Sequence, residues 1–352
     1  MSSDTHFKRE RANVEFRVGL CLPMGGSAGI WGPSCLASAR LAERELNQAN
    51  GIAGAPCEMR LIDASSESVD IEQNLIDLLD AGEVDALVGM CISPVRHRIL
   101  DAIGGRVPFV YTCLYEGSDS TPGLFAIGET AVRQLLPSIA WLSVHRGPKR
   151  WMLIGNDYIW PRVSHRIARH CIADGGSQVV GQAFLPFGLE DFSPLLEQIR
   201  RTRADAVLIS MVGQDAVEFN RAFAAAGLSA HVLRLSCAIE ENQLLAIGSA
   251  NTENLHVVSG YFASLQTDSN LSFKERYFRH AGVRAPALNS IGQSLYEGMH
   301  FLAAMLADGS PRRPRKAHTS ARTAQLHSSG GYATPIYLAQ ADGHQFQVIT
   351  QL

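Results

Sequence analysis

The sequence predicts an α/β protein made of two doubly wound lobes, each with a parallel central sheet. Short apolar runs alternate with segments of helical periodicity from Arg17 onward, which is typical of βαβ units. A polar, turn-rich stretch at 116–123 interrupts the alternation, which then resumes in a second series of the same kind. With 352 residues, 46% of them hydrophobic, the chain has enough material for two buried cores.

The first series predicts a four-stranded unit with intervening helices. Its first strand is the apolar run at 18–22, because interior strands of a parallel sheet are apolar on both faces. A helix follows from about Ser34, since apolar residues from Cys35 to Leu46 recur at spacings of three and four. The later elements are a strand at 59–62, a helix at 69–79, a strand at 86–88, a helix at 95–103 and a strand at 109–111.

The second series repeats this pattern after the polar stretch. It comprises helices at 130–144, 161–173, 191–201, 214–226 and 239–246, and strands at 151–155, 178–184, 206–210 and 232–235. A return strand at 255–258 and helices near 271–280 and 287–308 are expected on the first lobe, and a terminal hairpin at 335–339 and 345–349. We therefore assign 17–118 and 255–330 to the first lobe, 119–254 and 331–352 to the second, and 1–16 to a charged tail.

A basic, proline-containing segment separates the last helix from the hairpin. Residues 309–332 include two prolines and a run of arginine and lysine, a composition that buries too little apolar area to order itself. We expect a solvated loop there, with contact to a partner or to RNA as the alternative.

Charge and hydropathy restrict the partners and the compartment. The formal net charge of -3 gives no electrostatic reason to bind nucleic acid or an anionic membrane. Residues 1–16 are charged almost throughout, unlike a secretion signal, and no apolar run reaches the roughly 20 residues that span a bilayer. We expect a soluble cytoplasmic protein without membrane insertion, or a periplasmic one if a leader precedes this sequence.

The seven cysteines do not indicate a cofactor or a metal. They are scattered, with no C-x-x-C pair and no zinc-like spacing to histidine, so we interpret most of them as small buried residues. The glycine-rich segment 23–33 also lacks a phosphate-binding fingerprint. Its glycines serve a turn or the approach of a small ligand, and its Trp31 either lines a cleft or packs in the core.

Several predicted strands end in side chains suited to a small polar ligand. Parallel open sheets bind ligands beyond the carboxyl ends of their strands, so Tyr111 and Cys113 are expected at a pocket rim. Ser93 begins a helix after another strand, where its hydroxyl can cap that helix or bind the ligand. In the second lobe, the strand at 151–155 leads to Tyr158 and Trp160, which can supply aromatic walls.

Hydrolytic chemistry is the weaker alternative. Cys91 and Cys113 are the only tempting nucleophiles, but catalysis also requires a neighbouring base and an oxyanion site. His97 lies on the helix after Cys91, and Glu116 lies on a loop. We therefore predict that both cysteines line a pocket or pack, and that the protein is not an enzyme.

At these positions the chain resembles the type I periplasmic-binding-protein fold, in its class that binds branched-chain amino acids, amides and urea. It resembles most closely the cytoplasmic amide-sensing negative regulator of the aliphatic amidase operon. The most specific segments are Tyr115-Glu116-Gly117 and the Asp-Tyr-x-x-Pro-Arg sequence at 157–162. The other segments lie at 47–54, 87–93, 111–114, 154–156, 204–208 and 212–213.

The resemblance implies two Rossmann-like lobes joined by three crossovers, with a ligand buried between them. It implies that Ser93 bonds the polar end of the ligand, that Tyr111 covers it, and that Tyr158 and Trp160 close from the other lobe. Its remaining site positions are Cys91, Cys113, Leu114 and Gly213. The residues at 91, 113, 114 and 160 replace an aromatic, a threonine, a proline and a tyrosine of the regulator's pattern, which favours a bulkier or less polar amide.

By this resemblance, the expected function is a cytoplasmic sensor of a short-chain amide or urea-like molecule. Closure on the ligand would control a regulatory protein partner, such as an antiterminator, in amide or nitrile metabolism. The alternative is the substrate-binding component of an ABC importer for amides, urea or branched-chain amino acids, with a permease as partner. A homodimer stays open, direct nucleic acid binding is not expected, and neither a metal nor a cofactor is expected.

Overall fold

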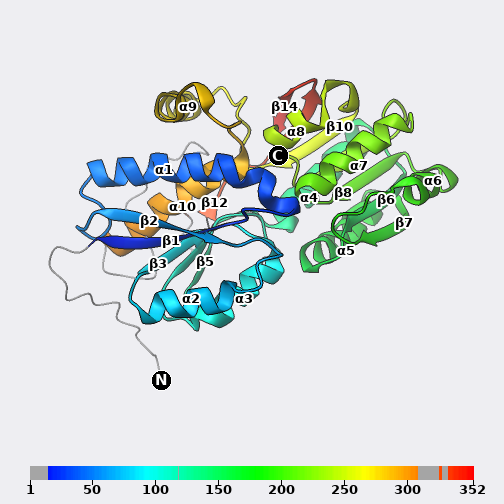
Figure 1. Ribbon diagram of the computed structural model, residues 1–352. Helices are drawn as coiled ribbons and strands as arrows, with labels where there is room; N and C mark the ends of the chain where they lie inside the picture. Colours follow the sequence, from blue (N-terminus) through cyan, green and yellow to red (C-terminus); the bar gives the residue numbers. More distant parts are fainter. Residues whose placement is uncertain (1–14, 118, 308–324, 327–331) are drawn as a thin grey trace.

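Two parallel sheets, one in each lobe, organise the protein (Figure 1). The computed structural model describes residues 15–117, 119–307, 325–326 and 332–352. The sheet of the first lobe has the order β2-β1-β3-β4-β5 and is parallel throughout. Its strands are β1 (Phe16–Leu22), β2 (Cys57–Asp63), β3 (Ala86–Gly89), β4 (Phe109–Tyr111) and β5 (Leu124–Ala126).

Helices cover both faces of the first sheet. The helix α1 packs against α10 and α9 on one face, and α2 packs against α3 on the other (Figure 1). The predicted apolar face of α1 is fully buried at Cys35, Ala39 and Ala42, as its spacing requires. The helices are the short η1 (Ser27–Trp31), α1 (Gly32–Gln48), α2 (Ile71–Asp80), α3 (Ser93–Ile103), α9 (Asp268–Ala281), η3 (Gly282–Arg284) and α10 (Ser290–Ala307).

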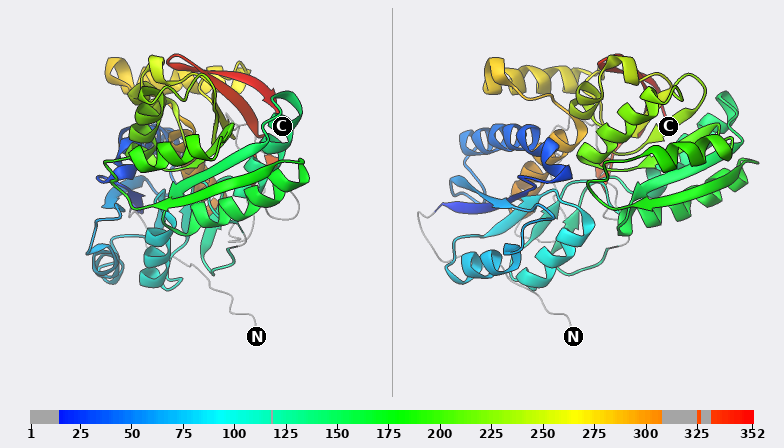
Figure 2. Two further views of the ribbon diagram at one scale, coloured as in Figure 1. Left: turned by 90° about the vertical axis from the view of Figure 1, so that its right-hand side faces the viewer. Right: turned by 45° about the vertical axis from the view of Figure 1, so that its right-hand side comes forward.

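The second lobe contains the larger sheet, with the order β14-β13-β10-β9-β8-β6-β7. Its strands are β6 (Arg150–Asn156), β7 (Gln178–Leu185), β8 (Ala206–Ser210), β9 (Leu233–Ser236), β10 (Leu255–Ser259), β13 (Tyr337–Asp342) and β14 (Gln345–Gln351). The strands β6 to β10 are parallel, whereas β13 and β14 form the predicted antiparallel hairpin. This hairpin, red in Figure 2, lies along the edge of the sheet. A separate two-stranded ladder joins β11 (Gln325–Leu326) to β12 (Tyr332–Ala333).

The helices of the second lobe complete its doubly wound arrangement. The helix α4 packs against α5 and β10, while α7 packs against α8. The elements are α4 (Ala131–His145), α5 (Ile159–Asp174), α6 (Ser193–Arg201), α7 (Gly213–Ala225), α8 (Glu241–Ile247) and η2 (Ser249–Asn251). The predicted α/β class with two lobes of parallel sheets is therefore confirmed.

Strand pairing moves two of the expected lobe boundaries. The strand β10, expected to begin the return to the first lobe, pairs with β9 and β13 in the second sheet. The short β5, which the sequence did not indicate, pairs with β4 and extends the first lobe to Ala126. A fully apolar strand has the same composition in either sheet, so periodicity could not decide between them.

Along the described residues, the chain changes lobe after β5, after β10 and between α10 and β13. Most of the tail predicted at 1–16 and of the loop predicted at 309–332 lies outside the described residues, so those interpretations stay predictions. No helix in the described ranges is both long and apolar enough to cross a bilayer. All seven cysteines are free and buried, which confirms their interpretation as small buried residues.

Candidate ligand-binding site

A small cavity lies between the lobes, where the carboxyl ends of strands from both sheets face each other. Its volume is about 30 Å³ for the centres of water molecules, which is room for roughly two waters. Its walls are mostly apolar and aromatic, with a few hydroxyl and thiol groups. The lining residues are Ala28, Trp31, Met90, Cys91, Ile92, Ser93, Tyr111, Cys113, Leu114, Tyr158, Trp160, Val212 and Ile291.

Strand pairing brings the predicted residues of the first lobe together. Because β3 and β4 are parallel neighbours, the segment from Cys91 to Ser93 and the segment from Tyr111 to Leu114 emerge at one edge of the sheet. Seven of the eight predicted contacts line the cavity, and only Gly213 does not. Trp31 also lines the cavity, which agrees with cleft lining, one of the two alternatives considered for this residue.

A hydrogen-bonded group at the ends of these strands fixes one wall. The Tyr111 hydroxyl donates to the Cys91 carbonyl oxygen at 2.7 Å, and the Cys113 thiol donates to the Tyr111 hydroxyl at 2.7 Å. Burial raises the pKa of Cys113 to about 11 and the pKa of Cys91 well above its ordinary value. Both thiols therefore stay protonated at neutral pH, which makes them poor nucleophiles.

Behind this wall, Ser93 is tied to a buried ion pair. The Ser93 hydroxyl donates to the Glu116 carboxylate, and Nη2 of Arg96 donates to the other Glu116 oxygen at 2.9 Å. The guanidinium of Arg96 also lies 3.4 Å from Asp119 and 4.9 Å from the centre of the Tyr111 ring. Burial alone would lower the pKa of Arg96, but Tyr111 and Glu116 outweigh it and raise that pKa above its ordinary value.

The local geometry argues against the capping role weighed for Ser93, whereas its ligand-binding role stays a prediction. Ile92, not Ser93, occupies the N-cap position of α3, and no side chain caps this helix. The Ser93 side chain is instead only 2% exposed and faces both the cavity and Glu116. Sequence reasoning did not identify Arg96 or the pairing of Glu116, because nothing in the spacing of these residues indicates a buried ion pair.

The second lobe contributes an aromatic wall. The rings of Tyr158 and Trp160 stack with centroids 6.3 Å apart, and Phe187 supports Tyr158 from 5.7 Å. Trp160 is 2% exposed, and its buried indole N–H has no hydrogen-bond partner among the described residues. A buried donor without a partner is costly, and Trp160 is one of the residues that line the cavity.

The lobes touch each other beside the cavity through η1. The Ser27 hydroxyl donates to the Val212 carbonyl at 2.9 Å, the Trp31 indole N–H donates to Gln243 at 3.2 Å, and the Asn242 amide donates to the Ile30 carbonyl at 2.8 Å. These bonds, together with those between Ser27 and Asp215, join η1 to the second lobe.

Gly213 belongs to this contact and not to the cavity wall. It opens α7 with φ of +58°, and a Cβ atom placed on it would lie 1.8 Å from the Ser27 carbonyl oxygen. Glycine therefore permits both the left-handed backbone and the close approach of the other lobe.

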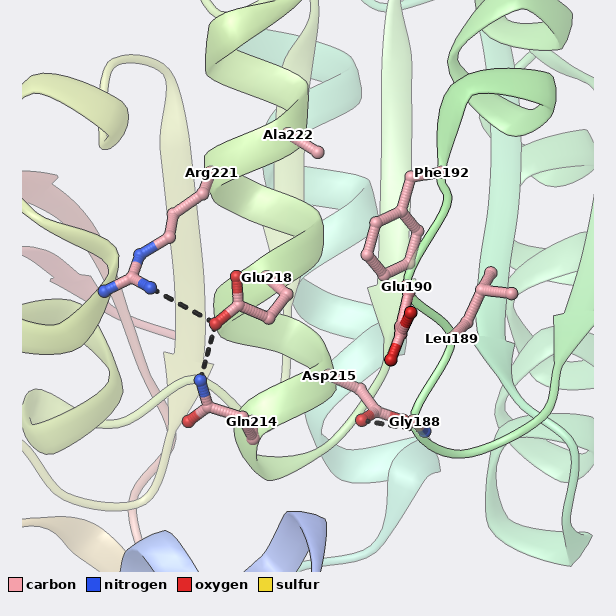
Figure 3. A pocket seen from close by; sticks show the side chains of 9 residues that line it. All are labelled: Gly188, Leu189, Glu190, Phe192, Gln214, Asp215, Glu218, Arg221 and Ala222. Carbon is pink, nitrogen blue, oxygen red and sulfur yellow. Dashed lines mark hydrogen bonds and ion pairs between the residues drawn. The ribbon is translucent and has the colours of Figure 1, made fainter.

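A larger hollow on the second lobe differs from the cavity in character (Figure 3). It measures about 390 Å³ and lies between α7 and the segment that follows β7. Its polar side chains bond one another, since Glu218 accepts from both Gln214 and Arg221 (Figure 3). Because these groups are exposed and mutually paired, the cavity between the lobes is the better candidate for ligand binding.

Comparison with protein families decides the family. A family model described as "Periplasmic binding protein" matches residues 15–350. The chain belongs to the periplasmic binding protein family. Within the curated proteins, it is 26% identical to the "Leu/Ile/Val-binding protein homolog 6" of Brucella melitensis over 236 residues. This match covers 65% of the chain and 58% of that relative, so the chain spans less than two thirds of the curated relative's length.

Solved periplasmic binding proteins share the fold at low sequence identity. A periplasmic binding protein from Burkholderia mallei has a TM-score of 0.83 and 18% identity, covering 96% of this chain and 94% of that one. A solute-binding protein of an R. palustris ABC transporter, in complex with benzoate, has a TM-score of 0.81 and 17% identity, covering 96% of both. The branched-chain amino acid transporter substrate-binding protein LivJ from Streptococcus pneumoniae, in complex with isoleucine, has a TM-score of 0.82 and 15% identity, covering 96% of this chain and all of that one.

Proposed function

We propose that this protein binds one small, compact and largely apolar molecule between its lobes, as the substrate-binding component of an ABC importer. The cavity there has room for about two waters in this structure, so it must widen to hold such a molecule. The mostly apolar and aromatic cavity between the lobes carries the proposal, because concave apolar sites with a few directed polar groups are characteristic of small-molecule binding. The solved relatives support it, since they include ABC transporter proteins in complex with benzoate and isoleucine. The protonated thiols of Cys91 and Cys113 support binding without catalysis.

The charge of the cavity argues against a free amino acid as the ligand. No described residue that lines the cavity carries a formal charge, whereas a buried ammonium group requires a paired anion. Glu116, whose carboxylate bonds the lining residue Ser93, already accepts from both Ser93 and Arg96. A neutral amide, or an aromatic or aliphatic molecule with one polar end, fits these walls better.

A cytoplasmic amide sensor that controls a regulatory protein is the second candidate. It is favoured by two groups of the cavity lining, the Trp160 indole N–H without a partner among the described residues and the Ser93 hydroxyl, since a neutral amide has both an acceptor and a donor. Both candidates depend on the same event, in which the ligand stabilises the closed lobes more than the open ones. They differ in the partner, which is a membrane permease in one case and a soluble regulator in the other.

A titration with several ligand classes tests the binding function. Trp31 and Trp160 line the cavity, so tryptophan fluorescence should report binding, with calorimetry as the independent measurement. The panel comprises propionamide, benzamide, urea, benzoate, 4-hydroxybenzoate, leucine and isoleucine. We expect a saturable response to at least one compact, largely apolar member, and the absence of a response to every member would refute the proposed ligand class.

Affinity capture and transport assays separate the two candidates. The liganded protein should retain a permease from detergent-solubilised membranes, and deleting its gene should abolish uptake of the labelled ligand. Retention of a soluble regulatory protein, with uptake unchanged, would instead support the sensor.

A further inference from the structure

We infer that Glu116 and Arg96 set the polarity of the ligand by making Ser93 a hydrogen-bond acceptor, so that the site selects a neutral amide over the isosteric carboxylate. This inference rests on the proposed function, in which the cavity between the lobes holds the ligand. It extends that function from a general ligand class to one functional group, and it assigns Glu116 and Arg96 as positioning residues that act through Ser93.

The position of the Ser93 proton is the first step. A serine hydroxyl has one proton to donate and two lone pairs that accept. In the structure, this proton is directed to the Glu116 carboxylate, which can only accept while it is ionised. Because Ser93 lines the cavity and its proton is already used, its hydroxyl can only accept a hydrogen bond from a ligand.

The ion pair holds Glu116 in the orientation that this arrangement requires. One carboxylate oxygen accepts from Ser93, and the other accepts from Nη2 of Arg96 at 2.9 Å. The Arg96 side chain is 3% exposed and that of Glu116 is 10% exposed, so water competes little for either group. Asp119, 3.4 Å from the same Nη2 atom, adds a second negative charge beside Arg96 without bonding Ser93.

The ligand must then complement an acceptor. The N–H of a primary amide can donate to Ser93, while its carbonyl oxygen can accept from the unpaired indole N–H of Trp160. A carboxylate of the same shape places a second acceptor against Ser93 and brings a charge into a cavity whose described lining residues carry none. Because buried polar groups left unpaired are costly, we expect the amide to bind at least about tenfold more tightly.

The substitution Glu116→Gln gives the sharpest test because it should reverse the Ser93 hydrogen bond. Arg96 can only donate, so the glutamine oxygen should stay on Arg96 and the glutamine NH₂ should face Ser93. Ser93 would then accept from residue 116 and turn its own proton toward the cavity. Calorimetric titration of benzamide against benzoate, and of propionamide against propionate, should show that the amide preference is lost or inverted in this variant.

Two further variants separate this role from a loss of structure. Asp119→Asn removes one negative charge beside the same Arg96 but leaves the Ser93 bond in place, and it should keep the amide preference. Ser93→Ala removes the acceptor, and it should weaken amide binding at least about tenfold more than carboxylate binding. General damage to the site would weaken both members of a pair alike and leave their ratio unchanged.

The outcomes distinguish the inference from the proposed function. Tighter binding of the carboxylates by the unaltered protein, or an unchanged ratio in folded Glu116→Gln protein, would overturn the inference while the proposed function stands. Binding of isoleucine or leucine without binding of either pair would likewise overturn only the inference. The absence of binding by every member of the panel and of the pairs would overturn both.

Discussion

Replacing Gly213 with alanine should prevent the lobes from closing. The Cβ atom would lie 1.8 Å from the Ser27 carbonyl oxygen, whereas ordinary contact begins at about 3.4 Å, so that oxygen must retreat by the difference of about 1.6 Å. A displacement of this size would lengthen a donor–acceptor distance of about 2.9 Å beyond the limit for a hydrogen bond. The hydrogen bonds that η1 makes across the lobes, including the three that join Ser27 to Val212, Trp31 to Gln243 and Ile30 to Asn242, should therefore be lost together.

The expected magnitude follows from these bonds. Each of the three named bonds contributes about 1 kcal/mol net, so their loss would disfavour the closed state by about 3 kcal/mol. If the ligand binds tightly only to closed lobes, its apparent affinity falls by the same free energy, which corresponds to a roughly hundredfold higher Kd.

A glycine just beyond the end of the same helix provides the control. Gly227 follows α7 with φ of +73°, but a Cβ atom there would meet nothing within 4 Å. Gly213→Ala and Gly227→Ala should share the cost of about 1 to 2 kcal/mol for a left-handed alanine, measured by urea unfolding. Only Gly213→Ala should lose ligand affinity and show a larger radius of gyration in small-angle scattering. Equal affinities in the two variants would refute this account of closure.

Three more predictions concern the buried polar groups. Burial lowers the pKa of His165 to about 4, so below pH 6.5 this histidine is protonated in the unfolded chain but stays neutral in the folded one. This difference should reduce the free energy of unfolding by roughly 2 to 3 kcal/mol between pH 7 and 4.5. His165→Leu should reduce this loss, as measured by urea unfolding at both pH values. Arg96→Leu should destabilise the fold by about 3 kcal/mol because it leaves Glu116 buried and unpaired, and adding Glu116→Leu should recover part of that stability; a fully additive double variant would contradict the pairing. Trp160→Phe keeps the aromatic wall but removes the unpaired N–H, so the Kd of an amide should rise about tenfold with little change in melting temperature.

The parts of the site that depend on strand ends were predictable from the sequence. Tyr111 and Cys113 lie at the end of one apolar strand, and Tyr158 and Trp160 follow another, so the rule for open parallel sheets was sufficient to place them at the cavity between the lobes. Their hydrogen bonds were not predictable, since they depend on which side chains meet after the lobes have packed.

Long-range pairing and close approach explain what the sequence missed. Arg96 lies in a segment correctly predicted as a helix, but its burial depends on Glu116 and Asp119 from a distant loop. Gly213 was predicted from the family resemblance. The need for glycine at this position comes from the close approach of Ser27, which lies 186 residues earlier in the chain and belongs to the other lobe. Neither contact leaves a periodic pattern in the chain.

The small volume of the closed cavity also has a kinetic consequence. The cavity has room for only about two waters, and η1 is bonded to the second lobe beside it, so a larger molecule can enter or leave only when the lobes move apart. The rate of lobe opening is therefore an upper limit for every dissociation rate measured from the closed state. Weakly bound ligands of different affinity should therefore approach the same maximal dissociation rate, which equals the rate of lobe opening and does not depend on the ligand.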